Sequence, residues 1–527
     1  MKLASVALAA QQPLDLSEGV GRFVDVKQKK LAGFSVDECR LYVRQETVGL
    51  WKMLETTTAS NRNLSVDGPP GTGKSTEVWA WALWKAVENK QKVTWFHFSK
   101  KAAIKVVIDG VAMTISSGYS AEIVDINRSD GSILVVDGLT KADSVNINRG
   151  CSAWRHQGKL QGESRCFVVV SSVSVTVALE QDREAEIETF TVGSWSLKQY
   201  EDACMDDTLY AEVKSKLVVD GDAEIALGRE ELILSKYRFA GGCARWMFEF
   251  GYVDWLKDFN GHLAKIGSYK NIFTEGGGDE AVMAANHLRG VSIVETVAGR
   301  EKKYFFISEY AAMELGKKCD DKRKFLISSY EKADEVDNPS FRGWIFEFDV
   351  DYQLQEAART AAKELGVTIR PTNVSEQWKV DKYITFSTVP SLAAEIKQFE
   401  LEATQSELWA KPAKWNQAAY DFLCFQKVKG TLHMKAVNAT GGGKHKVLLD
   451  VVNLLGKELG KELETSGYVV GAIRFDFIVP KGAAFQVGDV RGNLVGWKNP
   501  QNAAWAKQIS DVSGFIVIAD LVTTAPL

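Results

Sequence analysis

The chain has 527 residues, of which 45% are hydrophobic and 25% charged, with 10 prolines and a formal net charge of -4. That length exceeds one ordinary hydrophobic core, so we expect two to four domains, and the composition excludes a disordered or fibrous protein. No apolar run approaches the roughly eighteen residues that a membrane-crossing helix needs, so no membrane partner is expected. The seven cysteines lack CxxC spacing, which argues against a zinc cluster or disulfide framework and favours a reducing compartment.

Residues 1–45 are interpreted as a leader. They open with MKLASVALAA, one lysine followed by a short run of small apolar residues. This run is near the lower length limit of a secretion signal, so it is either a weak signal or an unstructured start.

A glycine-rich loop follows the apolar run 63–66 and precedes a helical pattern that extends to about Glu88. The GxxxxGK[ST] spacing lets backbone N–H groups and a helix N-terminus converge on phosphate oxygens. Lys74 is expected to reach the β- and γ-phosphates of ATP or another nucleoside triphosphate, and the Ser75 hydroxyl to bind Mg²⁺. The residues of this predicted nucleotide site are Gly68, Pro69, Pro70, Gly71, Thr72, Gly73, Lys74, Ser75 and Thr76.

An acid at the end of a neighbouring strand should complete the magnesium site. The apolar run ILVVD ends in Asp137, which we expect to be that carboxylate. The next residue is Gly138, where many ATPases have a glutamate that activates water. In one interpretation the protein binds ATP as a switch. In the other, a different base such as Asp143 supports hydrolysis, and the chain is then an ATPase.

Strands are expected near 63–66, 93–98, 133–137, 166–170 and 188–192, interleaved with helices. This alternation predicts an α/β fold with a parallel sheet and helices on both faces. Ser171, at the end of the fourth strand, is placed where a γ-phosphate sensor would lie. The P-loop NTPase core is assigned to residues 46–195.

Residues 196–335 are mostly helical in pattern and are expected to form a helical lid or winged-helix-like region, opened by a helix that Ser196 caps. Within it, FAGGCARWMF places Arg245 where a second sensor would contact the γ-phosphate; the alternative is a glycine turn with a surface arginine. KKCDDKRK, residues 317–324, is either a nuclear address or a solvated charged face.

The stretch FRGWIFEFDVDYQL, residues 341–354, is predicted to be a strand within a connector at 336–400. The tail, 401–527, holds 14 basic and 11 acidic residues. Five lysines and no acid lie between Phe422 and Leu449, which is either a strip for phosphate backbones or a solvated lysine face.

A predicted hairpin in the tail carries Asp421 before its first strand and polar residues on its second. Alternate strand residues share a face, so an acid with an i, i+2 polar pair can bind one metal ion beside one scissile phosphate, as in a smaller α/β restriction-endonuclease-like domain. The pair is Asn438 with Thr440, or in the other register His433 with Lys435. An ordinary hairpin with solvent-facing polar residues is the third interpretation.

The chain resembles the large Crinkler and retrotransposon-hot-spot (RHS) group, in which an AAA/STAND-like P-loop NTPase is joined to a C-terminal nuclease-like domain. The resemblance covers roughly residues 40–527 and depends on GPPGTGKSTEVWAWALW, ILVVDG, FAGGCARWMF, NPSFRGW, WAKPAKWNQAAYDF and NATGGGKH. It implies action in the nucleus, in a host cell for the secreted Crinkler effectors, with nuclear DNA or chromatin and host nuclear proteins as partners.

In that group the second nuclease strand often reads Gln-x-Thr with a histidine several residues on. Asn438, Thr440 and His445 stand at those positions, which favours the first register and a second metal site at Asp421. Asn438 departs from the pattern through its shorter side chain. The N-terminal ubiquitin-like segment with an LFLAK-type motif is not matched.

Three functions remain open from the sequence. The first is an NTPase module that gates a metal-dependent nuclease on Asp421, and the second is a nucleotide-switched DNA- or chromatin-binding effector with a degenerate nuclease domain. The third is a small-molecule kinase, which gives the tail no role. Nucleotide and DNA preference, and oligomeric state, stay undetermined.

Overall fold

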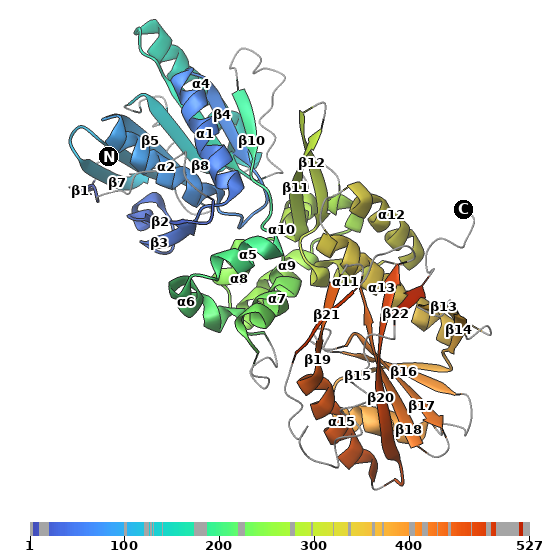
Figure 1. Cartoon of the computed structure of the whole chain (residues 1–527). Helices are drawn as coiled ribbons and strands as arrows, with labels where there is room; N and C mark the ends of the chain where they lie inside the picture. The colour runs from blue at the N-terminus through green and yellow to red at the C-terminus, as the bar shows by residue number, and fades with distance from the viewer. Residues whose placement is uncertain are drawn as a thin grey trace. The chain divides into compact units, whose positions relative to one another are not determined.

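The computed structural model of the chain (Figure 1) describes residues 4–9, 20–99, 103–120, 126, 129, 131–139, 141–172, 187–219, 227–273, 280–296, 299–319, 321–335, 339–360, 364–370, 374–399, 406–413, 420–428, 431–440, 444–464, 466–480, 486–491 and 516–519. Contacts divide it into two units, Met1–Ala311 and Ala312–Leu527. Each unit is described by itself.

The first unit is built on an eight-stranded sheet whose strands β5, β8, β9, β4 and β10 are parallel neighbours in that order. Strands β6, β7 and β1 extend the β5 edge antiparallel. Across the sheet the strands are β1 (Ala4–Ala7), β7 (Thr114–Ser120), β6 (Ala103–Asp109), β5 (Lys92–Phe98), β8 (Ile133–Leu139), β9 (Cys166–Ser171), β4 (Asn63–Asp67) and β10 (Ile187–Thr191). All five predicted strands are therefore present.

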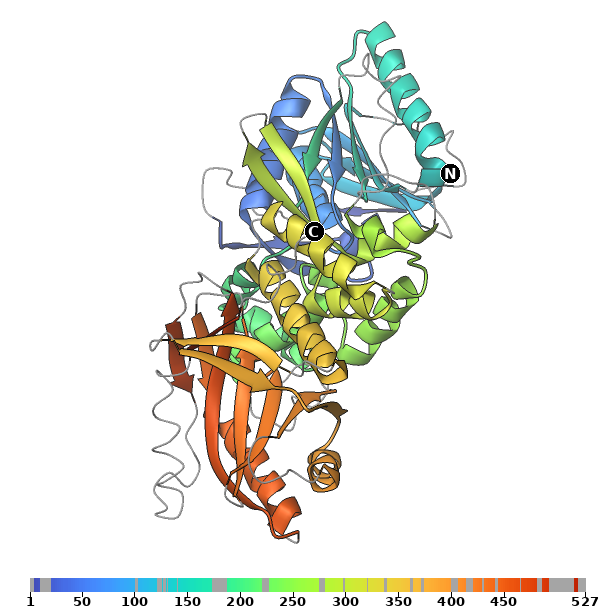
Figure 2. The same cartoon turned by 90° about the vertical axis from the view of Figure 1, so that its right-hand side faces the viewer.

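Helices cover both faces of this sheet because central strands such as β4 and β9 bury every one of their residues, on both faces. On β8, Ile133 and Val135 pack in one core with α1 (Gln45–Ala59) and α2 (Lys74–Glu88). Leu134 and Val136 pack in the other core with Trp154 of α4 (Lys141–Leu160), and Figure 2 shows α4 standing apart from α1 across the strands. The predicted α/β fold, a parallel sheet between helical layers, is confirmed.

Mostly helical structure follows β10, as the sequence predicts. The first helix is capped by Ser196, whose Oγ accepts a hydrogen bond from the Gln199 N–H at 3.3 Å. The helices are α5 (Leu197–Ala203), α6 (Asp207–Leu217), α7 (Arg229–Ala240), α8 (Ala244–Phe248), α9 (Tyr252–Leu263) and α10 (Glu280–Leu288), with a 3-10 turn η3 (Tyr269–Ile272).

Two antiparallel hairpins complete the first unit. One lies before α1 and consists of β2 (Phe23–Val26) and β3 (Cys39–Tyr42), with the 3-10 turn η1 (Lys29–Ala32) between its strands. The other, β11 (Arg289–Thr296) with β12 (Gly299–Phe306), follows α10 and was not expected from the sequence.

The second unit contains another mixed sheet. Across it the strands are β14 (Val374–Lys379), β13 (Glu364–Arg370), β22 (Ile516–Ala519), β20 (Val469–Pro480), β18 (Thr431–Ala439), β17 (Phe422–Val428), β16 (Glu407–Pro412) and β15 (Lys382–Phe386). Helices α14 (Val389–Gln398) and α15 (Leu449–Glu464) share a core with one face, and α13 (Pro339–Arg359) shares a core with the other.

The remaining elements of the second unit are outside this sheet. Strands β19 (Lys444–Leu448) and β21 (Gln486–Arg491) pair separately, α12 (Lys322–Glu335) packs with α13, and α11 (Glu309–Lys317) contains the boundary between the units. Residues 364–399, placed in the connector by the sequence, thus supply three strands and a helix of the second unit.

One secondary-structure prediction is wrong: residues 341–354 form part of helix α13 and not a strand. Phe346, Val350, Leu354 and Ala357 recur every three to four residues and pack on the sheet. Phe341 is buried as well, so the helix is apolar around much of its circumference. An apolar run without a polar face has no clear period, and a strand and a buried helix are then hard to distinguish.

Candidate nucleotide site and C-terminal polar site

The predicted phosphate loop connects β4 to α2. Gly68, Gly71 and Gly73 have φ angles of +149°, +77° and +106°, a region that side chains rarely adopt. A Cβ at Gly68 would lie 2.3 Å from the Val192 carbonyl oxygen. The loop conformation therefore requires its glycines, and it brings the backbone to the N-terminus of α2, where positive potential favours anions. All nine predicted residues, Gly68 to Thr76, lie in this loop or the first turn of α2.

Lys74 folds back onto the loop. Its Nζ donates hydrogen bonds to the carbonyl oxygens of Gly68 and Pro69 at 2.8 and 2.7 Å. Burial lowers the pKa of Lys74 to about 8, although the charges of Asp67 and Asp137 act in the opposite direction. The ammonium thus lies where phosphate oxygens could replace the two carbonyls, and a bound anion would favour its charged form.

Ser75 and Asp137 meet, as the sequence predicts. The Ser75 Oγ donates a hydrogen bond to Asp137 Oδ1 at 2.6 Å, and Asp137 is buried at the end of β8. A hydroxyl and a carboxylate are hard oxygen donors of the kind that Mg²⁺ prefers. The two residues fit a magnesium ion held beside the phosphate loop.

Gly138 cannot be replaced by the usual glutamate without a change of backbone. Its φ is +77°, and a Cβ there would lie 2.3 Å from the Phe98 carbonyl oxygen. The pairing of β8 with β9 also shifts register between Asp137 and Leu139. The glycine is a requirement of this irregular strand end. Asp143, the alternative base, has a side chain outside the described residues.

The sequence missed His97, which lies beside Asp137. The two residues are register partners on β5 and β8, and His97 Nδ1 is 2.8 Å from Asp137 Oδ2. Each carboxylate oxygen of Asp137 thus has one protein partner, His97 or Ser75. His97 and Phe98 end the predicted strand 93–98, and this polar residue near the strand end was the available signal; the strand pairing had to be known to use it.

The two predicted sensors lie at the same site. Ser171 ends β9, between the strands of Asp137 and the loop; it is buried, and its Oγ has no hydrogen-bond partner within the described part of the chain. The Arg245 N–H of α8 donates to the Gly71 carbonyl oxygen at 3.3 Å, and its side chain is half exposed. Helix α8 is therefore docked on the phosphate loop.

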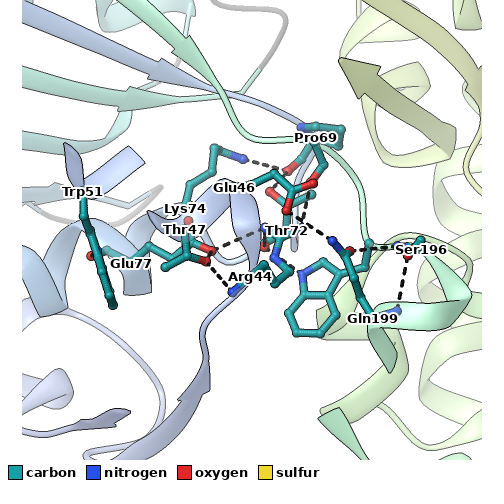
Figure 3. A network of polar contacts seen from close by, with 12 residues as sticks. Arg44, Glu46, Thr47, Trp51, Pro69, Thr72, Lys74, Glu77, Ser196 and Gln199 are labelled. Carbon is teal, nitrogen blue, oxygen red and sulfur yellow. Dashed lines mark hydrogen bonds and ion pairs between the residues drawn. The ribbon is translucent and has the colours of Figure 1, made fainter. Parts of the chain in front are cut away.

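A buried network supports the loop from behind (Figure 3). Arg44 Nη2 donates to the Thr72 carbonyl oxygen at 3.2 Å and pairs with Glu77 Oε1 at 3.3 Å. Trp195 Nε1 donates to the same Thr72 oxygen at 3.0 Å, and the Arg44 guanidinium lies 4.8 Å from the Trp195 ring centroid. Burial raises the pKa of Glu77 although Arg44 opposes this. The segment before α1 and the start of the lid thus fix one peptide of the loop.

In the second unit the hairpin β17–β18 brings Asp421 to the end of β18. The Asp421 N–H donates to the Val437 carbonyl oxygen at 2.9 Å, and Asp421 Oδ2 accepts from the Ala439 N–H at 2.7 Å. Asn438 is buried nearby, and the Thr440 N–H bonds the Ile478 carbonyl oxygen at 2.9 Å. Three of the four predicted residues are thus close in the fold.

His445 lies elsewhere in the topology. It belongs to β19, where its register partner is Val487 of β21, and its side chain is outside the described residues. In the other register, Lys435 Nζ is 3.1 Å from Glu407 Oε1; Glu407 is buried, and 11% of the Lys435 side chain is exposed. Lys435 is therefore part of an ion pair with little solvent exposure.

A second buried cluster near Asp421 was not expected. Lys411 Nζ is 3.0 Å from Asp351 Oδ2, and the Tyr383 hydroxyl and Gln355 amide donate to Asp351 Oδ1. Burial alone would lower the pKa of Lys411, but nearby acids, chiefly Asp351 and including Asp421, raise it. Since Asp351 belongs to the stretch mistaken for a strand, the sequence offered no route to this cluster.

Two further findings concern metal-binding clusters and membrane-crossing helices. Within the described ranges, no group of three or more His, Cys, Asp or Glu side chains is arranged to hold a metal ion. No helix among those ranges has both the length and the apolar character needed to cross a membrane.

Comparisons with known proteins give weak matches only. No family model and no curated protein matches the chain. Among solved structures, C. elegans PCH-2 matches at 11% identity and a TM-score of 0.25, over 38% of this chain and 61% of PCH-2. The closed state of Hsp104 with ATPγS and FITC casein matches at 9% identity and a TM-score of 0.26, over 89% of this chain and 78% of that one.

The S. cerevisiae Hsp104-ADP complex matches at 10% identity and a TM-score of 0.24, over 90% of this chain and 80% of that one. These neighbours are AAA+ ATPases, and none of the comparisons supports a Crinkler, RHS or nuclease relationship. At such TM-scores the likeness carries no argument, so the assignment of the first unit as a P-loop NTPase-type α/β fold depends on its own strand order, glycine loop and Ser75–Asp137 contact.

Proposed function

We propose that the first unit binds a nucleoside triphosphate, ATP in the first instance, together with Mg²⁺. The observation that carries this proposal is the 2.6 Å contact between Ser75 and Asp137 beside a glycine loop that already holds the Lys74 ammonium. Lys74 would contact phosphate oxygens, and Ser75 and Asp137 would hold the metal. When bound, Mg²⁺ supplies charge neutralisation to the phosphates.

Two residues that lie next to the loop in the fold would sense whether nucleotide is bound. The buried Ser171 hydroxyl can accept or donate a hydrogen bond to a γ-phosphate, and Arg245 is carried on a helix whose backbone contacts Gly71. Because Gly138 excludes a glutamate, the nucleotide acts as a slowly hydrolysed switch. The lid helices and the loop move together when that switch changes.

For the second unit, the proposal follows the resemblance to Crinkler and RHS proteins: a nuclease-like domain that the nucleotide switch regulates and that acts on nuclear DNA, in a host cell if the protein is a secreted effector. The support is the proximity of Asp421, Asn438 and Thr440 at one end of the β17–β18 hairpin. The lysines between Phe422 and Leu449 other than Lys435, which pairs with Glu407, would contact phosphate backbones, and host nuclear proteins are further partners.

The alternative is a nucleotide-switched DNA- or chromatin-binding effector with a degenerate nuclease domain. A specific observation favours it: one Asp421 carboxylate oxygen already accepts the Ala439 N–H, and Asn438 contributes no charge. A single carboxylate committed to the backbone is a poor fit for a catalytic Mg²⁺.

Plasmid nicking with Mg²⁺ or Mn²⁺ separates the two. Wild type is compared with Lys74→Ala and Asp421→Ala, with Glu462→Ala as a matched control because Glu462 is an exposed acid on α15. Loss of cutting in Asp421→Ala, with cutting retained in the Glu462→Ala control, supports the nuclease. Absence of cutting by wild type, with salt-sensitive DNA binding retained, favours the binding effector.

A parallel measurement addresses the nucleotide. The switch is supported if wild type binds ATP but its steady-state ATP turnover rate does not exceed the rate of the Lys74→Ala control. If wild type and Lys74→Ala bind ATP equally weakly, the proposal for the first unit fails.

A further inference from the structure

The hairpin β11–β12 is fastened beside the phosphate loop. The Ser194 N–H donates to the Val291 carbonyl oxygen at 2.9 Å, and the Val291 N–H donates to Ser194 Oγ at 3.0 Å. The Arg300 guanidinium also lies 4.9 Å from the ring centroid of Phe190 on β10. Contacts from both strands of the hairpin therefore fix its position against the edge of the sheet that carries the loop.

Lys302 on β12 reaches the residue that precedes the loop. Its Nζ is 2.6 Å from Oδ2 of Asp67, the last residue of β4. Asp67 is 8% exposed, and among the described residues its Oδ1 is buried without a hydrogen-bond partner. On the other side, Lys74 Nζ contacts the carbonyl oxygen of Gly68. Two ammonium groups thus flank the first peptide of the loop.

This arrangement has an electrostatic consequence. A nearly buried carboxylate next to a phosphate loop repels a bound triphosphate, and that repulsion is little screened in a site of low dielectric. Lys302 offsets the charge of Asp67 in the nucleotide-free chain. Its long side chain can rotate about several bonds, so a nearby phosphate competes with Asp67 for the same ammonium.

We propose that Lys302 is a second phosphate-binding cation of the nucleotide site, which pairs with Asp67 without nucleotide and contacts the terminal phosphate of a bound nucleoside triphosphate. This inference rests on the proposed function. A diphosphate, lacking that phosphate, leaves Lys302 paired with Asp67.

Titration calorimetry with Mg²⁺-ATP and Mg²⁺-ADP tests the proposal. Lys302→Met should weaken ATP binding roughly tenfold or more, the effect of one charge-assisted hydrogen bond, and ADP binding at most about threefold. Lys303→Met is the matched control, because Lys303 is the neighbouring lysine and pairs with Glu301 on the same strand at 3.0 Å. It should leave both affinities unchanged, and Lys302→Arg should retain most of the ATP preference.

The double variant Asp67→Asn/Lys302→Met distinguishes a direct contact from simple neutralisation of Asp67. A direct contact predicts that ATP binding stays weak in the double variant. Recovery of wild-type affinity there, or equal weakening of ATP and ADP in Lys302→Met, overturns the inference while leaving the proposed function intact. Equal ATP affinity in wild type and Lys74→Ala would instead refute the proposed function.

Hydrogen exchange of the wild-type chain keeps the test informative if Lys302→Met does not fold. Amides of residues 289–306 should be better protected with Mg²⁺-ATP than with Mg²⁺-ADP. Equal protection in the two states contradicts the proposal.

Discussion

The two polar sites of this protein use their charged groups differently. Around the phosphate loop, Lys74, Ser75 and Asp137 contact one another or the loop, and the Ser171 hydroxyl is left without a hydrogen-bond partner within the described chain. At the β17–β18 hairpin, Asp421 instead accepts a backbone N–H. The first site keeps side chains ready for a ligand, whereas the second uses its acid to hold its own strands together.

An ion pair with little solvent exposure lies in each unit, but the two pairs differ in how directly they contact the residues of a candidate site. Arg44–Glu77 holds the backbone of the phosphate loop itself. Lys435–Glu407 lies within the second sheet and joins β18 to β16 across the intervening strand β17. Breaking the first pair should therefore affect both stability and nucleotide binding, and breaking the second should affect stability.

The largest expected effect comes from Arg44→Met. It leaves Glu77 buried without its cation, which costs about 3–5 kcal/mol of unfolding free energy, and it removes a donor from the Thr72 carbonyl oxygen. Urea unfolding measures the loss, and ATP affinity should fall in the same variant. Lys435→Met should match the loss of stability but leave ATP affinity unchanged.

The double variant Arg44→Met/Glu77→Gln is the control, because it removes the buried charge together with its partner. It should recover a large part of the lost stability. A loss of less than about 1 kcal/mol in Arg44→Met, the usual size for an exposed pair, would show that the pair is not buried in solution.

The pH dependence of stability should differ between the units. Burial, with a contribution from Lys216, lowers the pKa of Lys236 in α7 to about 8. Burial raises the pKa of Asp349 in α13 to about 7, against a hydrogen bond from Gln353. Unfolded reference pKa values are about 10.4 for Lys and 3.9 for Asp. Folding thus favours the neutral form of each group.

The signs are opposite along the pH axis. The contribution of Asp349 is complete below about pH 4 and is lost as pH rises to about 7; that of Lys236 is complete above about pH 10.4 and is lost as pH falls to about 8. Each change is on the order of 3 kcal/mol. Asp349→Asn and Lys236→Met should each flatten their own window in urea unfolding. A slope that persists in the variant contradicts the assignment.

The smallest effects compare Asp421→Ala with Ser75→Ala. Asp421→Ala leaves the buried Ala439 N–H without its acceptor, so it should cost about 1–3 kcal/mol of unfolding free energy. Ser75→Ala removes the donor to Oδ1 of the buried Asp137, so it should also cost about 1–3 kcal/mol of unfolding free energy, but unlike Asp421→Ala it should weaken Mg²⁺-dependent ATP binding as well. Weaker ATP binding in Asp421→Ala, or unchanged ATP binding in Ser75→Ala, measured by titration calorimetry, would remove the distinction between the two sites.

The residues of the first candidate site could be named from the sequence because they belong to local motifs. Gly68 to Thr76 are consecutive, and the apolar run that ends in Asp137 is a strong strand signal whose position at the sheet edge follows from parallel topology. His97, Arg44 and Lys302 were missed. Each acts through a partner 30 or more positions away in the chain, so no local period or spacing marks it.

The second site was less predictable for a similar reason. The hairpin itself was expected and is present, and Asp421 pairs with β18 as its position suggested. Asp351 and Lys411 were not found, because α13 is buried on more than one side and its pattern resembles a strand. Whether Asp421 serves a metal or the backbone depends on hydrogen bonds that spacing cannot specify.

By itself, then, the sequence determined the α/β class, the five parallel strands and the glycine loop, because these follow from apolar runs and from backbone conformations that only glycine adopts without strain. Only the tertiary structure decided which charged groups meet at that loop. It packed Arg44 behind the loop, set His97 against Asp137 and brought Lys302 from a distant hairpin to Asp67. Such pairings depend on the order of the strands in the sheet and on the packing of distant segments, which bring together residues that are remote in sequence.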